Sequence, residues 1–115
     1  MNEKAVNVTM SEYEAFIATT WMRDDNPLVN EIRMWNGLQG ETGEMAEVNK
    51  KWHRDGGDPD VYRERMTKEI GDALYYLATI ANFNDITMDE AMRANVDKLS
   101  SRKVRGLLHG SGDDR

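Results

Sequence analysis

The sequence contains no cysteine, which excludes disulfide bonds, thiol catalysis and zinc sites built on thiolates. Histidine is nearly as scarce, since the chain has 2. His53 and His109 lie far apart and lack the spacing of metal ligands, so a phosphohydrolase site built on several imidazoles is disfavoured. Candidate chemistry has to be sought among carboxylates, amides and cationic side chains.

Positive charge and long apolar runs are also lacking. The 15 lysines and arginines are outnumbered by 21 aspartates and glutamates, which gives a formal net charge of −6 and argues against a broad nucleic-acid-binding surface. The longest apolar run, residues 73–81, is too short to cross a bilayer, which takes about 20 residues, and the first residues show no signal-peptide pattern. We expect a cytoplasmic protein that binds neither nucleic acid nor membrane.

Helix-start and helix-stop signals divide the chain into four segments. Ser11-Glu12-Tyr13-Glu14 and Thr87-Met88-Asp89-Glu90 are capping-box patterns, while Asn26-Pro27 and Asp58-Pro59 combine an N-cap residue with a first-turn proline. The predicted helices cover about residues 11–23, 27–53, 59–83 and 87–105. No strand-like alternation of useful length occurs. With 115 residues the sequence predicts one all-α domain, a four-helix bundle over residues 1–105, followed by a flexible glycine-rich tail, 106–115.

Two of these helices carry pairs of carboxylates inside their apolar stripes. At about 3.6 residues per turn, Glu41 and Glu44 share a face with apolar residues of the second helix. Glu69 and Asp72 do the same on the third helix. An ionised carboxylate on a buried face is strongly penalised unless it is paired or bound to a metal. Two facing pairs would form a cage of hard oxygen ligands suited to Mg²⁺, with Mn²⁺ as a substitute.

The fourth helix carries the complementary charge. Asn95, Lys98 and Arg102 share one face by the same spacing. Cationic and amide groups opposite a divalent-metal site are suited to polyphosphates, because they neutralise the oxygens that the metals leave free. Bound metal ions would also lower the pKa of water for attack on phosphorus. The residues together indicate metal-assisted hydrolysis of a phosphoanhydride.

The acidic residues also allow a simpler interpretation and a different choice of pair. A single Glu-x-x-Glu pair in an acidic helical protein is most often a solvated face that pairs with lysines such as Lys50 and Lys51. Glu44 and Glu47 also have this spacing. We favour Glu41 and Glu44, because Glu47 lies about 60° further from the apolar stripe. The conjunction of two acidic pairs with one basic face favours a functional site.

Three stretches, GLQGETGEMAEVNKKW, EIGDALYYLATIA and NVDKLSSR, resemble the MazG-like all-α nucleoside triphosphate pyrophosphohydrolases over about residues 12–105. The resemblance implies that Glu41, Glu44, Glu69 and Asp72 are metal ligands with catalytic roles. It implies that Asn95 and Lys98 bind the nucleotide phosphates, with Arg102 beside them. The implied reaction converts an NTP or dNTP and water to the monophosphate and pyrophosphate. The short length and the ending KLSSRKVRGLLHGSGD are similar to bacteriophage members, whose location is the host cytoplasm.

The resemblance also implies a homodimer or homotetramer, which agrees with a third helix that is apolar nearly all round. Tyr13, Phe16, Trp21 and Trp35 are candidates for stacking on a base, although aromatic residues at helical spacing more often belong to the core. Two alternatives to the enzyme remain: a non-catalytic helical oligomer that binds metal and nucleotide, and a regulatory alarmone-binding protein. Base and sugar preference do not follow from the sequence.

Overall fold

The computed structural model describes residues 7–114 as four α-helices, which confirms the all-α prediction. The helices are α1, Met10–Thr20; α2, Pro27–Asp55; α3, Pro59–Phe83; and α4, Met88–Arg105. No helix within residues 7–114 is long and apolar enough to cross a membrane.

The helix ends follow the predicted capping residues at three of the four starts. The side chains of Asn26, Asp58 and Thr87 each accept a hydrogen bond from a backbone N–H of the first turn that follows. α2 continues to Asp55, two residues beyond its predicted end, and stops at Gly56, which has a φ of 69°. A positive φ is unfavourable for residues with a side chain, and the glycine ends the helix for this reason.

The start and the end of α1 differ from the prediction. Thr9, not Ser11, is the N-cap: its Oγ1 accepts a hydrogen bond from Glu12 N at 3.1 Å, and the Glu12 carboxylate accepts one from Thr9 N at 3.2 Å. Glu14 instead accepts a hydrogen bond from Met88 N at 3.2 Å and so ties α1 to the start of α4. α1 ends at Thr20 because Trp21 is already extended.

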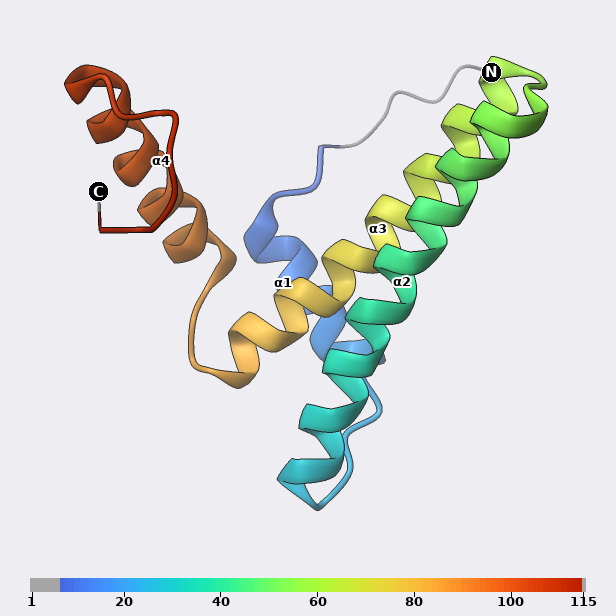
Figure 1. The fold of residues 1–115 in the computed structure, drawn as a ribbon. Coiled ribbons are helices and arrows are strands. Elements are labelled where there is room, and N and C mark those ends of the chain that lie inside the picture. Colours follow the sequence, from blue (N-terminus) through green and yellow to red (C-terminus); the bar gives the residue numbers. More distant parts are fainter. Residues whose placement is uncertain (1–6, 115) are drawn as a thin grey trace.

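α2 and α3 form a long antiparallel hairpin, and α1 packs across α3 (Figure 1). α4 contacts α1 and α3 near its first turn and extends away from the hairpin. The radius of gyration is 17.5 Å, whereas a compact chain of this length has a radius of about 13 Å. The predicted four helices are therefore present, but one chain does not close them into a bundle.

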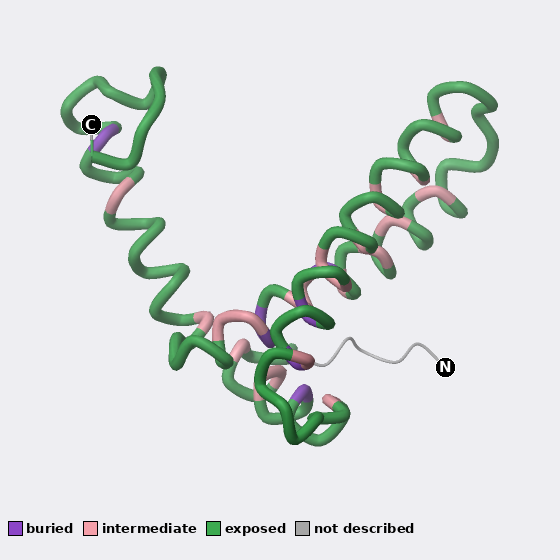
Figure 2. The backbone as a smooth tube through the Cα atoms, turned by 60° about the horizontal axis from the view of Figure 1, so that its bottom comes forward, coloured by how far each residue is buried: buried purple, intermediate pink, exposed green. Residues whose placement is uncertain are grey.

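The small core lies where α1 crosses the hairpin. Ile17, Met34, Ala73 and Ala78 are its buried apolar residues. Gly37 lets α2 approach α3 here, because a Cβ at this position would overlap the ring of Tyr76. Most of the surface of α4 and much of the outer faces of α2 and α3 are exposed (Figure 2).

Candidate metal and phosphate site

Three of the four predicted metal ligands lie together on the hairpin. Glu41 of α2 and Glu69 and Asp72 of α3 each offer a carboxylate oxygen, and these oxygens lie within 4.8 Å of one another. We call these three side chains the carboxylate cluster. It forms because the helix faces that carry the acids also carry apolar residues and pack against each other. On α2, Leu38 and Met45 flank Glu41, and both are partly buried.

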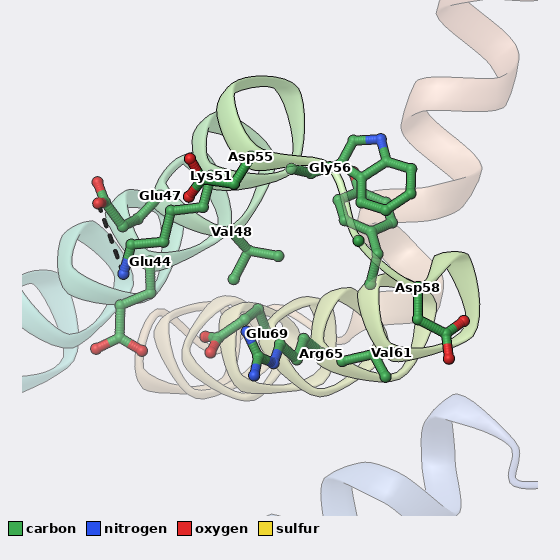
Figure 3. A pocket seen from close by; sticks show the side chains of 13 residues that line it. Glu44, Glu47, Val48, Lys51, Asp55, Gly56, Asp58, Val61, Arg65 and Glu69 are labelled. Carbon is green, nitrogen blue, oxygen red and sulfur yellow. Dashed lines mark ion pairs between the residues drawn. The ribbon is translucent and has the colours of Figure 1, made fainter.

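Glu44, the fourth predicted ligand, is exposed and lies outside the carboxylate cluster. Together with Glu69 it lines a cavity of about 530 Å³ between the end of α2 and the start of α3. Figure 3 shows the carboxylates of Glu44 and Glu69 at the same end of this cavity. Glu44 can therefore reach a ligand bound at the cluster from one side.

Two oxygens of the cluster have no hydrogen-bond donor. Oε2 of Glu41 and Oε2 of Glu69 are buried, and neither has a partner within residues 7–114. Buried acceptors are almost always satisfied in proteins, so these two oxygens need an explanation. A divalent cation would satisfy both, and a donor set made only of carboxylate oxygens suits Mg²⁺ or Mn²⁺. The residues therefore fit such an ion.

Burial and repulsion between neighbouring carboxylates raise the pKa values of two acids of the cluster. Burial raises the pKa of Glu41, and the charges of Asp72 and Glu44 raise it further. Burial likewise raises the pKa of Glu69, with the charge of Glu44 next in importance. Among residues 7–114, no cation is a cause of either shift. The cluster is an uncompensated negative site.

The alternative acidic pair behaves as a solvated face. Glu47 is exposed and forms ion pairs with Lys50 at 3.5 Å and Lys51 at 3.8 Å, the second of which is drawn in Figure 3. Pairs of this kind contribute little to stability. Glu47 thus has two cationic neighbours, whereas Glu41 has no ion-pair partner in the described part of the chain.

A second, smaller hollow borders the cluster on its other side. It has a volume of about 380 Å³ and is lined by Glu41 and Asp72 together with four residues of α1 and α3: Phe16, Thr20, Tyr75 and Tyr76. Phe16 is 58% exposed there, so this aromatic ring is available for stacking. Two other residues predicted to stack on a base already have partners within the protein. Tyr13 of α1 donates a hydrogen bond to Gly71 O, and Trp21, which follows α1, packs edge-on against Tyr76.

Sequence reasoning missed several residues around the cluster. The hydroxyl groups of Thr20 and Tyr75 lie 2.7 Å apart at the smaller hollow, and Arg65 lines the larger cavity beside Glu69. Arg65 lies four residues before Glu69, a spacing that could have linked the two. No sequence signal connects Thr20 with Tyr75, because 55 residues separate them and only the packing of α1 on α3 brings them together.

The predicted phosphate-binding residues of α4 do not lie beside the cluster of their own chain. Asn95 is exposed, while Lys98 and Arg102 contact the C-terminal residues Gly112 and Asp113. α4 makes no contact with α2 within residues 7–114 (Figure 1). The acidic and basic halves of the predicted site are therefore separate in a single chain, and their roles stay predictions.

The raised pKa values predict how the metal-free protein responds to pH. A carboxyl with a raised pKa binds its proton more tightly in the folded than in the unfolded chain. The contribution of these two carboxyls to stability should thus be greatest below their ordinary pKa of 4.5 and should be lost as pH rises through the raised pKa values of Glu41 and Glu69. In EDTA near neutral pH, Glu41→Gln should therefore melt about 2–5 °C above the wild type, as thermal unfolding measures directly.

Millimolar Mg²⁺ should reverse this order, because only the ionised cluster binds the cation. Glu47→Gln is the matched control, since Glu47 already has two lysine partners. Equal melting temperatures for Glu41→Gln and wild type in EDTA would show that the cluster is not strained by its charge.

Comparisons with known proteins identify the family. The model of the MazG nucleotide pyrophosphohydrolase domain matches residues 30–106, a region that includes all seven predicted site residues. The chain belongs to this family, and the resemblance inferred from its motifs is confirmed.

Two relatives are similar over most of the chain. The chain is 42% identical to the Gene 37 protein of Mycobacterium phage L5 over 81 residues, which are 69% of this chain and 71% of the phage protein. It is 33% identical to the uncharacterized protein YpjD of Bacillus subtilis strain 168 over 106 residues, 89% of each chain. No solved structure matches the chain.

Proposed function

We propose that this protein is a Mg²⁺-dependent nucleotide pyrophosphohydrolase that converts an NTP or dNTP to the monophosphate and pyrophosphate. One observation carries the proposal: a MazG domain has three carboxylates within 4.8 Å of one another, two of them with buried oxygens that lack a donor. Structural acidic faces are solvated and paired with lysines, as Glu47 is. The cluster departs from that pattern, because one oxygen each of Glu41 and Glu69 is buried and neither oxygen has a donor within residues 7–114, although Asp72 is exposed.

The carboxylates of the chain would bind the cation and orient the attacking water. Glu41, Glu69 and Asp72 would hold the cation, with Glu44 completing the ligand set from the edge of the larger cavity. When bound, Mg²⁺ would supply Lewis-acid polarisation of the phosphoryl oxygens. The carboxylates would also orient a water that enters the cluster and take up the proton that it releases.

Asn95, Lys98 and Arg102 would bind the phosphates, and in this proposal they come from α4 of a second copy. Several apolar side chains along the outer faces are exposed: Ile70 and Leu77 on α3, and Met92, Val96 and Leu99 on α4. An extended apolar surface of this kind typically marks a protein interface. A homo-oligomer would cover it and bring a cationic α4 to a partner's acidic cluster, completing a site that one chain leaves in two halves.

The decisive experiment is product analysis with a panel of NTPs, dNTPs and modified triphosphates. The wild-type protein with Mg²⁺ should release pyrophosphate and a monophosphate in equal amounts, and EDTA should abolish both. ³¹P NMR distinguishes these products from a diphosphate and inorganic phosphate.

Two results would contradict the proposal. Release of inorganic phosphate with a diphosphate would reassign the cleaved bond. Absence of turnover across the panel, with Mg²⁺ and nucleotide still raising the melting temperature, would identify a non-catalytic binding protein.

A further inference from the structure

The segment after α4 folds back along that helix and covers its basic residues (Figure 1). Gly106 ends α4 in the left-handed conformation with a φ of 71°, and Leu107 N donates a hydrogen bond to Arg102 O at 2.7 Å. Gly112 has a φ of 90°, which a residue with a side chain rarely adopts. These two glycines let the tail turn and return.

The tail ends on the two cations that are predicted to bind phosphate. Lys98 Nζ donates to Asp113 Oδ1 at 2.9 Å. Arg102 Nη2 donates to Gly112 O at 2.9 Å and lies 3.5 Å from the same Asp113 oxygen. One carboxylate oxygen is thus shared between a lysine and an arginine, as a phosphate oxygen commonly is.

Arg102 is unusual for a cation near the end of a helix. It is 4% exposed, although the other residues of α4 are exposed apart from the half-buried Met88 and Lys98, and Figure 2 shows the buried stretch of α4 beneath the returning tail. Its Nε is buried and has no acceptor within residues 7–114. A buried guanidinium normally uses its donors fully, so the tail satisfies this group only in part. An oxyanion with more acceptors than one carboxylate would satisfy more of these donors.

The charges at this contact also favour a phosphate over the Asp113 carboxylate. The hydrogen bond from Lys98 and then its charge hold the pKa of Asp113 below its usual range, and Arg102 adds to this effect. Asp113 is nevertheless 81% exposed at its side chain, so water competes strongly for this contact. A group with two or three negative charges would compete better than a single exposed carboxylate.

We propose that the C-terminal tail is an autoinhibitory strap, in which the Asp113 carboxylate occupies the oxyanion site of Lys98 and Arg102 until a phosphate displaces it. The proposal rests on the function proposed above, because that function supplies the phosphate ligand. It goes beyond it by assigning a regulatory role to residues 112–113, which the catalytic proposal does not use. Substrate and product would both have to compete with the tail.

Calorimetric titration with pyrophosphate in the presence of Mg²⁺ tests the strap without any turnover. Asp113→Asn should bind pyrophosphate about 2–5-fold more tightly than the wild type, the range expected for loss of an exposed ion pair. Asp114→Asn is the matched control, since it removes the same charge from the adjacent residue and should leave the affinity unchanged. Deletion of residues 110–115 should give a gain at least as large as Asp113→Asn, because it also removes the Gly112 carbonyl contact.

A second comparison separates competition at the cations from a general charge effect. In a Lys98→Gln background, Asp113→Asn should bring a smaller gain in affinity than it does in the wild type, because the two side chains act on each other. Equal affinities of wild type, Asp113→Asn and the truncated protein, or an equal gain in Asp114→Asn, would overturn the strap. Pyrophosphate affinity is read independently of hydrolysis, so failure of the strap and failure of the enzymatic proposal are distinguishable.

Discussion

Glu41→Gln should lower Mg²⁺-dependent nucleotide hydrolysis by about 10²–10³-fold, with the fold unchanged. The amide has the same shape as the carboxylate, but it carries no charge and is a weak ligand for Mg²⁺. Glu41 contributes one of the three cluster oxygens and one of the two buried oxygens without a donor, so the substitution removes both a ligand and a negative charge from the cluster. The measurement is kcat and KM at several Mg²⁺ concentrations.

The matched control lies six residues further along α2. Glu47→Gln removes the same charge from the same helix, but from a side chain already paired with Lys50 and Lys51, and activity should change less than about threefold. A loss in Glu47→Gln as large as that in Glu41→Gln would contradict the assignment and favour the Glu44 and Glu47 pair. The effect of Glu44→Gln shows how far the exposed fourth carboxylate takes part in metal binding.

The acidic half of the site could be predicted because it depends on local periodicity. Glu41, Glu69 and Asp72 lie at helical spacing within apolar stripes, and a helix must turn such a stripe toward its neighbour. The turn at residues 56–58 is short, so the two helices that carry the acids become antiparallel neighbours. Spacing and a short connection were enough to bring Glu41, Glu69 and Asp72 together, but they also predicted Glu44, which lies outside the cluster.

The position of α4 could not be predicted in the same way. It is determined by the loop between α3 and α4, where Asp85 has a φ of 58°, and by the hydrogen bond between Glu14 and Met88 N, residues that are 74 apart. The helical wheel of α4 groups Asn95, Lys98 and Arg102 on one face, but a wheel does not say what that face meets.

Local sequence signals also could not decide where α1 begins, and the predicted start at Ser11 is wrong for this reason. Thr9-x-x-Glu12 and Ser11-x-x-Glu14 satisfy the same capping rule, so the sequence offers two equivalent starts. The structure uses the first, and the second acid is engaged by the distant start of α4. Tertiary contacts decide between local signals of equal strength.

Subunit complementation should restore activity from two inactive variants if the site is shared between copies. Glu41→Gln removes the acidic half, and Lys98→Gln removes a cation from the basic half on α4. In a mixed dimer with sites built in trans, one site combines both defects and the other combines the two intact halves. Because random pairing makes half of the dimers mixed, an equimolar mixture should recover about a quarter of wild-type activity.

The matched control mixes Glu41→Gln with Glu69→Gln. Both substitutions lie in the carboxylate cluster, so every site in that mixture has a damaged acidic half and no activity should return. Co-expression with two different tags isolates the mixed oligomers, and their pyrophosphate release is compared with that of each parent. If Glu41→Gln and Lys98→Gln stay inactive together although mixed oligomers form, α4 serves the cluster of its own chain. It would then have to swing about the Asn84–Ile86 loop toward α2, which cross-linking between α2 and α4 within a single chain would detect.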